Sequence, residues 1–146
     1  MNTTADLEKK FTCFLDRGWD LDSIGPFLRS YLRLLVPYHS ELSTAELSVL
    51  REREKQMQGF AFDDSKYELV RLTSKNNMSN DLKEGHNLSK TSALNRLIYC
   101  AMSDSSESDV FYLSEPIFEF ANSMEIKSDQ LETILCAEFS DFKPNS

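Results

Sequence analysis

The sequence predicts an all-α fold, a compact bundle of six or seven helices in a single domain that spans residues 1–146. Apolar residues recur at helical spacing along most of the chain, most clearly in residues 92–102. The chain has only 4 glycines and 4 prolines, too few for a turn-dense all-β protein. Its 146 residues, 40% of them hydrophobic and 27% charged, suit one soluble globular domain.

The N-terminal residues predict two helices. The first is expected to begin with Thr4 as its cap and to end at Gly18. Its apolar face is formed by Leu7, Phe11, Phe14 and Leu15. The second has Pro26 near its first turn and ends at Pro37, because proline excludes its predecessor from the α region. Its apolar face comprises Ile24, Phe27, Leu28, Tyr31, Leu32 and Leu35. Residues 34–36 widen this face, so we expect it to be the central and most buried helix.

The middle of the chain predicts a third helix and a less regular stretch. Ser43 and Glu46 match a capping box, and the helix that they open ends at Gly59. Its charge run, residues 51–55, is interpreted as a solvated face. Asp64 or Ser65 can cap the segment that follows, and residues 67–72 fit either a helix or a short strand. The polar residues 76–91 predict a loop between two helical halves.

Three further segments of the second half predict helices. Residues 92–102 carry Leu94, Leu97, Ile98, Ala101 and Met102 on one face. After a polar loop at residues 103–109, Ser114 is the expected N-cap of a helix with Pro116 in its first turn. Its inward face is predicted to carry Ile117, Phe118, Ala121 and Met124. Ser128 is the expected cap of the last helix, which carries Leu131, Ile134, Leu135 and Phe139.

The cysteines predict a reducing compartment. Cys13, Cys100 and Cys136 are odd in number and widely spaced, with no CxxC pair. Each lies in a segment that reads as an apolar helix face, so we expect three buried thiols. The N-terminus lacks a basic segment followed by an apolar one, and no apolar run approaches the roughly 18–20 residues that span a bilayer. The sequence therefore predicts a cytoplasmic protein that does not bind a membrane.

Motifs of catalysis and of cofactor binding are absent from the sequence. It contains no GxxxxGK[ST], GxGxxG, GxSxG or HExxH, and its two histidines, His39 and His86, lie far from the cysteines along the chain. We therefore expect a protein that is not an enzyme and that has no cofactor. An acidic chain also disfavours nucleic-acid binding. Five basic residues are candidates for a small basic patch, which is interpreted as the flank of an amphipathic helix: Lys9, Lys10, Arg17, Arg29 and Arg33.

Charge is distributed very unevenly along the chain. Residues 1–96 contain 14 basic and 14 acidic side chains, whereas residues 97–146 contain only Lys127 and Lys143 against 10 acids. The whole formal net charge of −8 therefore falls in the last third, and a field of one sign steers a partner of the opposite sign. The predicted partner-binding residues are Asp104, Glu107, Asp109, Phe111, Tyr112, Glu115 and Glu119. Phe111 and Tyr112 are either interface anchors or core side chains.

The segments 93–104 (ALNRLIYCAMSD) and 113–126 (LSEPIFEFANSMEI) resemble the helix–acidic turn–helix hairpin of TerB-like (tellurite-resistance) domains. Ser105 stands where that family has a glycine. The resemblance implies an all-α fold and a metal site at the acidic turn, with Asp104 as the residue carried over. The carboxylates of Asp104, Glu107 and Asp109 would suit a hard divalent cation, although the loop does not match the EF-hand pattern.

Two functions follow as hypotheses. The first is a non-enzymatic interaction domain whose acidic face binds a basic protein and neutralises or escorts it, as an immunity protein, inhibitor, chaperone or adaptor would. The alternative is a TerB-like, divalent-metal-binding domain of a stress response.

Overall fold

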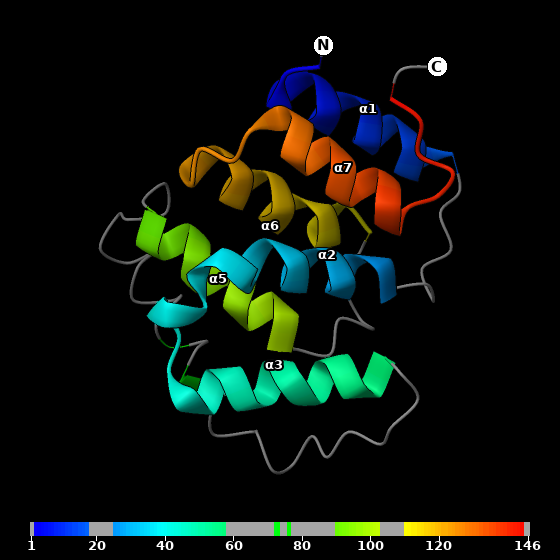
Figure 1. Ribbon diagram of the computed structural model, residues 1–146. Coiled ribbons are helices and arrows are strands. Elements are labelled where there is room, and N and C mark those ends of the chain that lie inside the picture. The colour runs from blue at the N-terminus through cyan, green and yellow to red at the C-terminus, as the bar shows by residue number, and fades with distance from the viewer. Residues whose placement is uncertain are drawn as a thin grey trace.

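The computed structural model describes residues 2–17, 25–57, 72–73, 76, 90–102 and 110–144, and in these residues the all-α prediction is confirmed. They form six α-helices and one 3₁₀ helix, and no strand (Figure 1). The helices are α1 (Thr4–Asp16), α2 (Gly25–Leu35), η1 (Val36–Glu41, the 3₁₀ helix), α3 (Thr44–Met57), α5 (Lys90–Met102), α6 (Val110–Ser123) and α7 (Ser128–Glu138).

Helix α2 lies at the centre of the bundle. It contacts η1, α3, α5, α6 and α7, and seven of its eleven residues are buried. Helices α1 and α7 lie side by side at one end of the molecule, and α3 lies at the other end, against α5 and α2 (Figure 1). Both marked chain ends lie at the α1–α7 end. The prediction that the second helix is the central one is confirmed.

An aromatic cluster joins the elements at the α1–α7 end. The ring of Phe11 on α1 lies edge-on to Phe139, with 4.8 Å between ring centroids, and edge-on to Phe142 at 5.1 Å. It also contacts Phe27 of α2 at 6.3 Å and Phe118 of α6 at 5.9 Å. Edge-to-face pairs of this kind add to the stabilisation that burial provides. Phe11 therefore links α1, α2, α6 and the end of α7 in one core.

Helix α1 begins one residue earlier than predicted. Thr3, not Thr4, is the N-cap, with an extended backbone (φ −78°, ψ 169°). Its hydroxyl accepts from the Asp6 N–H at 3.1 Å, and the Asp6 carboxylate accepts from the Thr3 N–H at 3.0 Å. The residue three positions after Thr4 is Leu7, which offers no such carboxylate, so the capping box selects Thr3. The predicted end at Gly18 lies outside the described residues.

The capping box predicted at α3 is confirmed. The Ser43 hydroxyl accepts from the Glu46 N–H at 3.1 Å, and the Glu46 carboxylate accepts from the Ser43 N–H at 2.9 Å. The charge run that follows is not wholly solvated, because Arg53 is only 5% exposed and donates to Gln56 at 2.7 Å. A long arginine can bury its stem while its head stays hydrogen-bonded, which explains this exception. The predicted end at Gly59 is outside the described part.

Helix α5 begins at Lys90, so the predicted loop over residues 76–91 is wrong for its last two residues. Asn76 is helical as well, and residues 77–89 of that loop lie outside the described ranges. Leu72 and Thr73 are helical, whereas residues 67–71, the segment left open between helix and strand, are not described. The buried face of α5 contains Leu94, Leu97, Ile98 and Ala101, as the periodicity predicts.

Helix α6 corrects the prediction that Ser114 caps a helix. The helix begins at Val110, which places Ser114 inside it, 6% exposed, and Pro116 in its interior. The reason is the apolar face, since Leu113, Ile117 and Phe120 recur at helical spacing and are all buried. Burial of this face outweighs the backbone hydrogen bond that an interior proline removes.

The turn between α6 and α7 ends one helix and starts the next without the predicted cap. Lys127, not Ser128, is the N-cap of α7, and it makes no side-chain capping bond. Helix α6 ends in a Schellman motif, in which the Ile126 N–H donates to the Ala121 carbonyl at 2.9 Å and the Glu125 N–H to Asn122 at 3.4 Å. The extended backbone at Lys127 (φ −63°, ψ 138°) places this residue at the N-cap, and Ser128 is the first residue of the helix.

Candidate functional site

The predicted partner-binding residues fall into three groups. Asp104, Glu107 and Asp109 lie outside the described residues. The backbones of Phe111 and Tyr112 belong to the first turn of α6, although the expected cap at Ser114 had placed them before this helix; their side chains are not described. Glu115 and Glu119 lie one turn apart on α6, and the structure brings both of them to Arg96 of α5.

Arg96 holds two carboxylates with one positive charge. Its guanidinium forms a close ion pair with Glu119, and its Nη2 lies 3.5 Å from Glu115 Oε2. Partial burial lowers the pKa of Arg96, but the charges of Glu119 and then Glu115 outweigh this effect, so the pKa is raised. The Glu119 side chain is 17% exposed, whereas that of Glu115 is 55% exposed. Glu119 therefore helps to hold α5 to α6, while Glu115 is the acid of this group that solvent reaches more freely.

Other acids of the last third also bind basic or polar side chains of the first half. Glu138 at the end of α7 is 7% exposed and binds two arginines of α2: Arg29 Nε at 2.6 Å and Arg33 Nε at 2.8 Å. Glu132 accepts a hydrogen bond from Asn2 at 2.9 Å. Part of the negative charge that the sequence concentrates in the last third is thus used inside the fold.

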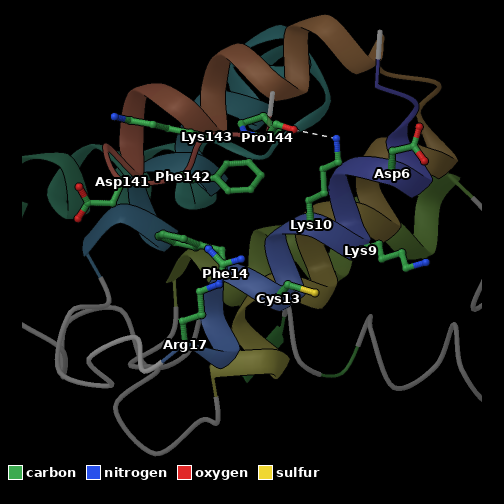
Figure 2. Close-up of a pocket in the computed structure, with 10 residues that line it drawn as sticks. All are labelled: Asp6, Lys9, Lys10, Cys13, Phe14, Arg17, Asp141, Phe142, Lys143 and Pro144. Atoms are coloured by element: carbon green, nitrogen blue, oxygen red, sulfur yellow. Dashed lines mark hydrogen bonds between the residues drawn. The ribbon is translucent and has the colours of Figure 1, made fainter. Parts of the chain in front are cut away.

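The predicted basic patch is divided in two by the structure. Arg29 and Arg33 are paired with Glu138, whereas Lys9, Lys10 and Arg17 line a groove on the outer side of α1. The groove has a volume of about 640 Å³ and lies between α1 and the segment that follows α7 (Figure 2). Its lining comprises Asp6, Lys9, Lys10, Cys13, Phe14, Arg17, Asp141, Phe142, Lys143 and Pro144. Sequence reasoning missed this site because its two sides are more than a hundred residues apart.

The three cysteines do not share one environment. Cys13 is exposed and lines the groove, so the prediction of three buried thiols is wrong for it. It lies two residues from both Phe11 and Leu15, so it points away from the core-facing side of α1, which carries Leu7, Phe11 and Leu15. Cys100 and Cys136 are half-buried against the core. Burial raises the pKa of the Cys100 thiol to about 11, with Arg96 lowering it and Glu119 raising it further.

Within the residues that the structure describes, no group of three or more His, Cys, Asp or Glu side chains is placed to hold a metal ion. His39 is exposed in η1, and His86 lies outside these residues. Nor does any helix in the described part have the length and apolar character that crossing a membrane requires. Comparisons of the chain with protein-family models, with curated proteins and with solved structures found no match.

Proposed function

We propose that this chain is a non-enzymatic protein-binding domain whose α5–α6 hairpin contacts a basic protein partner, in the manner of an immunity protein, inhibitor, chaperone or adaptor. The observation that carries the proposal is the charge balance of the hairpin. The hairpin, residues 90–123, contains two basic residues, Lys90 and Arg96, and five acids. Arg96 is shared between Glu115 and Glu119, so it offsets only one of the five negative charges.

The remaining charges lie close together along the chain. Helix α5 ends at Met102 and α6 begins at Val110, so Asp104, Glu107 and Asp109 belong to the connection between two helices that pack on each other. Glu115 adds a largely exposed carboxylate in the second turn of α6. A surface of one sign accelerates encounter with a partner of the opposite sign, and the acceleration weakens as salt screens it.

The test compares two variants that change the net charge equally. In the hairpin variant, Asp104, Glu107 and Asp109 are each replaced by Lys. In the control, the exposed acids Glu8, Asp16 and Glu54 are each replaced by Lys. Proteins retained by the immobilised wild-type chain are identified by mass spectrometry, and their association rates with all three forms are measured at several salt concentrations.

We expect a basic protein to bind the wild type and the control, and to associate at least tenfold more slowly with the hairpin variant. The association rate with the hairpin variant should also depend less on salt concentration. Equal association rates for the two variants, or the absence of any specific partner, would show the proposal to be wrong. Circular dichroism checks that each variant keeps its helices.

Substitution of the two aromatic residues that precede Glu115 distinguishes a role in partner binding from a role in core packing. Phe111→Ala or Tyr112→Ala should speed dissociation of the partner, with a loss of about 2–4 kcal/mol, if the ring is an interfacial anchor. If the ring instead fills the core, the same substitution should lower the melting temperature, with a cost of about 3–5 kcal/mol for a large aromatic residue. Faster dissociation at an unchanged melting temperature is the result that the proposal requires for at least one of them.

A further inference from the structure

The groove beside α1 is positively charged although the chain as a whole is negative. Four basic side chains line it, Lys9, Lys10, Arg17 and Lys143, against two acids, Asp6 and Asp141. The local balance is therefore +2 in a chain of net charge −8. One of the two lysines in residues 97–146, Lys143, belongs to this lining. An excess of positive charge at a concave site attracts anions and raises their local concentration.

The two acids offset only part of this charge. Asp6 is part of the capping box of α1, and the Thr3 N–H, then the Thr3 hydroxyl, and more weakly Lys10 and Lys9 lower the pKa of its carboxyl, so Asp6 stays ionised at neutral pH. Asp6 and Asp141 lie toward opposite ends of the groove, with Lys10, Cys13 and Phe14 between them (Figure 2).

Lys10 is held in place by neutral oxygens. Its ammonium donates to Asn2 Oδ1 at 2.6 Å and to the Pro144 carbonyl at 2.7 Å. An ammonium has three N–H donors, so two hydrogen bonds leave one for a ligand. Neither of these acceptors carries a charge, so these two hydrogen bonds do not offset the positive charge of Lys10 at the groove. The bond to Pro144 also ties the segment after α7 to α1 and so fixes the width of the groove.

The wall of the groove is aromatic. Phe142 is 4% exposed, and its ring lies 5.5 Å from that of Phe14 and 5.1 Å from that of Phe11, centroid to centroid. Phe14 is half-buried and forms part of the lining. An apolar wall beside a few charged groups is the usual make-up of a small-molecule site, and about 640 Å³ lies within the usual range of such sites.

We propose that this groove binds a small organic anion, a carboxylate or a phosphate ester, whose charged group contacts Lys10 and Arg17 and whose apolar part lies against Phe14 and Phe142. The volume favours a small molecule over a longer acidic peptide. The proposal does not depend on the acidic hairpin, which lies on α5 and α6, nor on the partner proposed for it.

The experiment uses the full chain and the fluorescent anion anilinonaphthalene sulfonate, displaced by three matched naphthalene compounds. Naphthoate and naphthyl phosphate carry the two candidate anionic groups, and naphthol is uncharged at neutral pH. The groove variant is Lys9→Gln with Arg17→Gln, which removes one of the two proposed contacts and one further charge of the lining and leaves the Lys10 bond to Pro144 in place. Its control is Arg51→Gln with Lys90→Gln, which removes the same charge at two exposed positions of α3 and α5.

We expect one dye to bind per chain, naphthoate or naphthyl phosphate to displace it, and naphthol to displace it at least tenfold less well. The stronger of the two anions identifies the charged group. The groove variant should bind at least fivefold more weakly than the control. Bound anion should also slow the alkylation of Cys13 by iodoacetamide, since Cys13 lines the groove.

Three results would overturn the proposal. The first is equal displacement by naphthol, which would indicate apolar binding alone. The second is unchanged affinity in the groove variant, with Cys13 unprotected. The third is stronger displacement by an acidic hexapeptide than by either naphthalene anion, which would make the groove a peptide site.

Discussion

The chemistry of each cysteine is set by its position on its helix. Cys13 lies on the side of α1 that points away from the core and is exposed, whereas Cys100 of α5 packs against the core and is half-buried. A thiolate is the reactive form of cysteine, and burial in apolar surroundings disfavours the charged form. Burial raises the pKa of Cys100 to about 11, so below that pH its thiol stays mostly protonated.

We predict that only Cys13 reacts rapidly with a disulfide reagent in the native protein at pH 8. Cys100 is a protonated thiol at this pH, and the pKa of Cys136 is also raised, chiefly by burial and then by Glu132. Stopped-flow measurement with Ellman's reagent should show a fast phase of one thiol, lost in Cys13→Ser and kept in Cys100→Ser. A fast phase that survives Cys13→Ser would contradict the prediction.

Glu125 is a second residue whose position governs its energetics. It lies at the C′ position of α6 with a positive φ of 55°, where a residue with a Cβ is strained. We predict that Glu125→Gly is more stable than Glu125→Ala by about 1 kcal/mol, because glycine adopts this conformation freely. Urea denaturation of the two variants checks this, and the alanine variant controls for the lost charge. Equal stabilities would show that the backbone there is unstrained.

Between elements, single polar contacts join helices that the sequence does not connect. Helix α6 continues through Pro116, which cannot donate a hydrogen bond and crowds the preceding turn. The buried Tyr31 hydroxyl of α2 donates to the Leu113 carbonyl in this part of α6. Burial raises the pKa of Tyr31 well above its ordinary value, so the phenol remains a donor throughout the neutral range. This hydrogen bond helps to hold α6 against α2.

We predict that Tyr31→Phe destabilises the protein by about 1–3 kcal/mol, because the Leu113 carbonyl then loses a buried donor. Tyr38→Phe is the matched control, since Tyr38 is half-buried with its ring edge-on to Phe120 at 5.3 Å. The control should change the free energy of unfolding by less than about 0.5 kcal/mol. Chemical denaturation measures both, and similar losses in the two variants would contradict a special role for the Tyr31 hydroxyl.

Across the whole molecule, the acidic last third is held by positive charge from earlier helices. Glu138 binds two arginines of α2, and Arg96 of α5 binds two carboxylates of α6. In the described part of the chain, each of the six α-helices contributes to one continuous core. Within this core, the rings around Phe11 connect α1, α2, α6 and the chain that follows α7.

We predict that Phe11→Ala costs about 3–5 kcal/mol of the free energy of unfolding, the range found for large aromatic side chains in cores. Phe11→Leu keeps most of the volume and should cost less than half as much. Thermal and urea denaturation measure the loss, and the leucine variant remains informative if the alanine variant does not fold. A loss below about 1 kcal/mol in Phe11→Ala would show that the cluster is loosely packed.

The sequence by itself determined the all-α class and most of the helices that the structure describes, with their buried faces. Helical periodicity and capping depend on residues three or four positions apart. The buried face of α5 and the capping box of Ser43 and Glu46 can therefore be predicted from the sequence without knowledge of the fold. The N-caps predicted at Thr4, Ser114 and Ser128 are wrong because they were inferred from residue type alone. A cap needs a particular backbone conformation as well as a residue type, and the burial of Leu113 carries α6 past Ser114.

Only the tertiary structure decided how the charges and polar groups are used. Glu115 stays largely exposed and Glu119 is partly buried, although both pair with Arg96 of the neighbouring helix. The ion pair of Arg29 with Glu138 joins residues 109 positions apart, and the bond of Lys10 to Pro144 joins residues 134 apart. Such contacts form when packing brings distant segments together, so they cannot be predicted from local sequence patterns. The basic groove, and the exposure of Cys13 within it, are consequences of that packing.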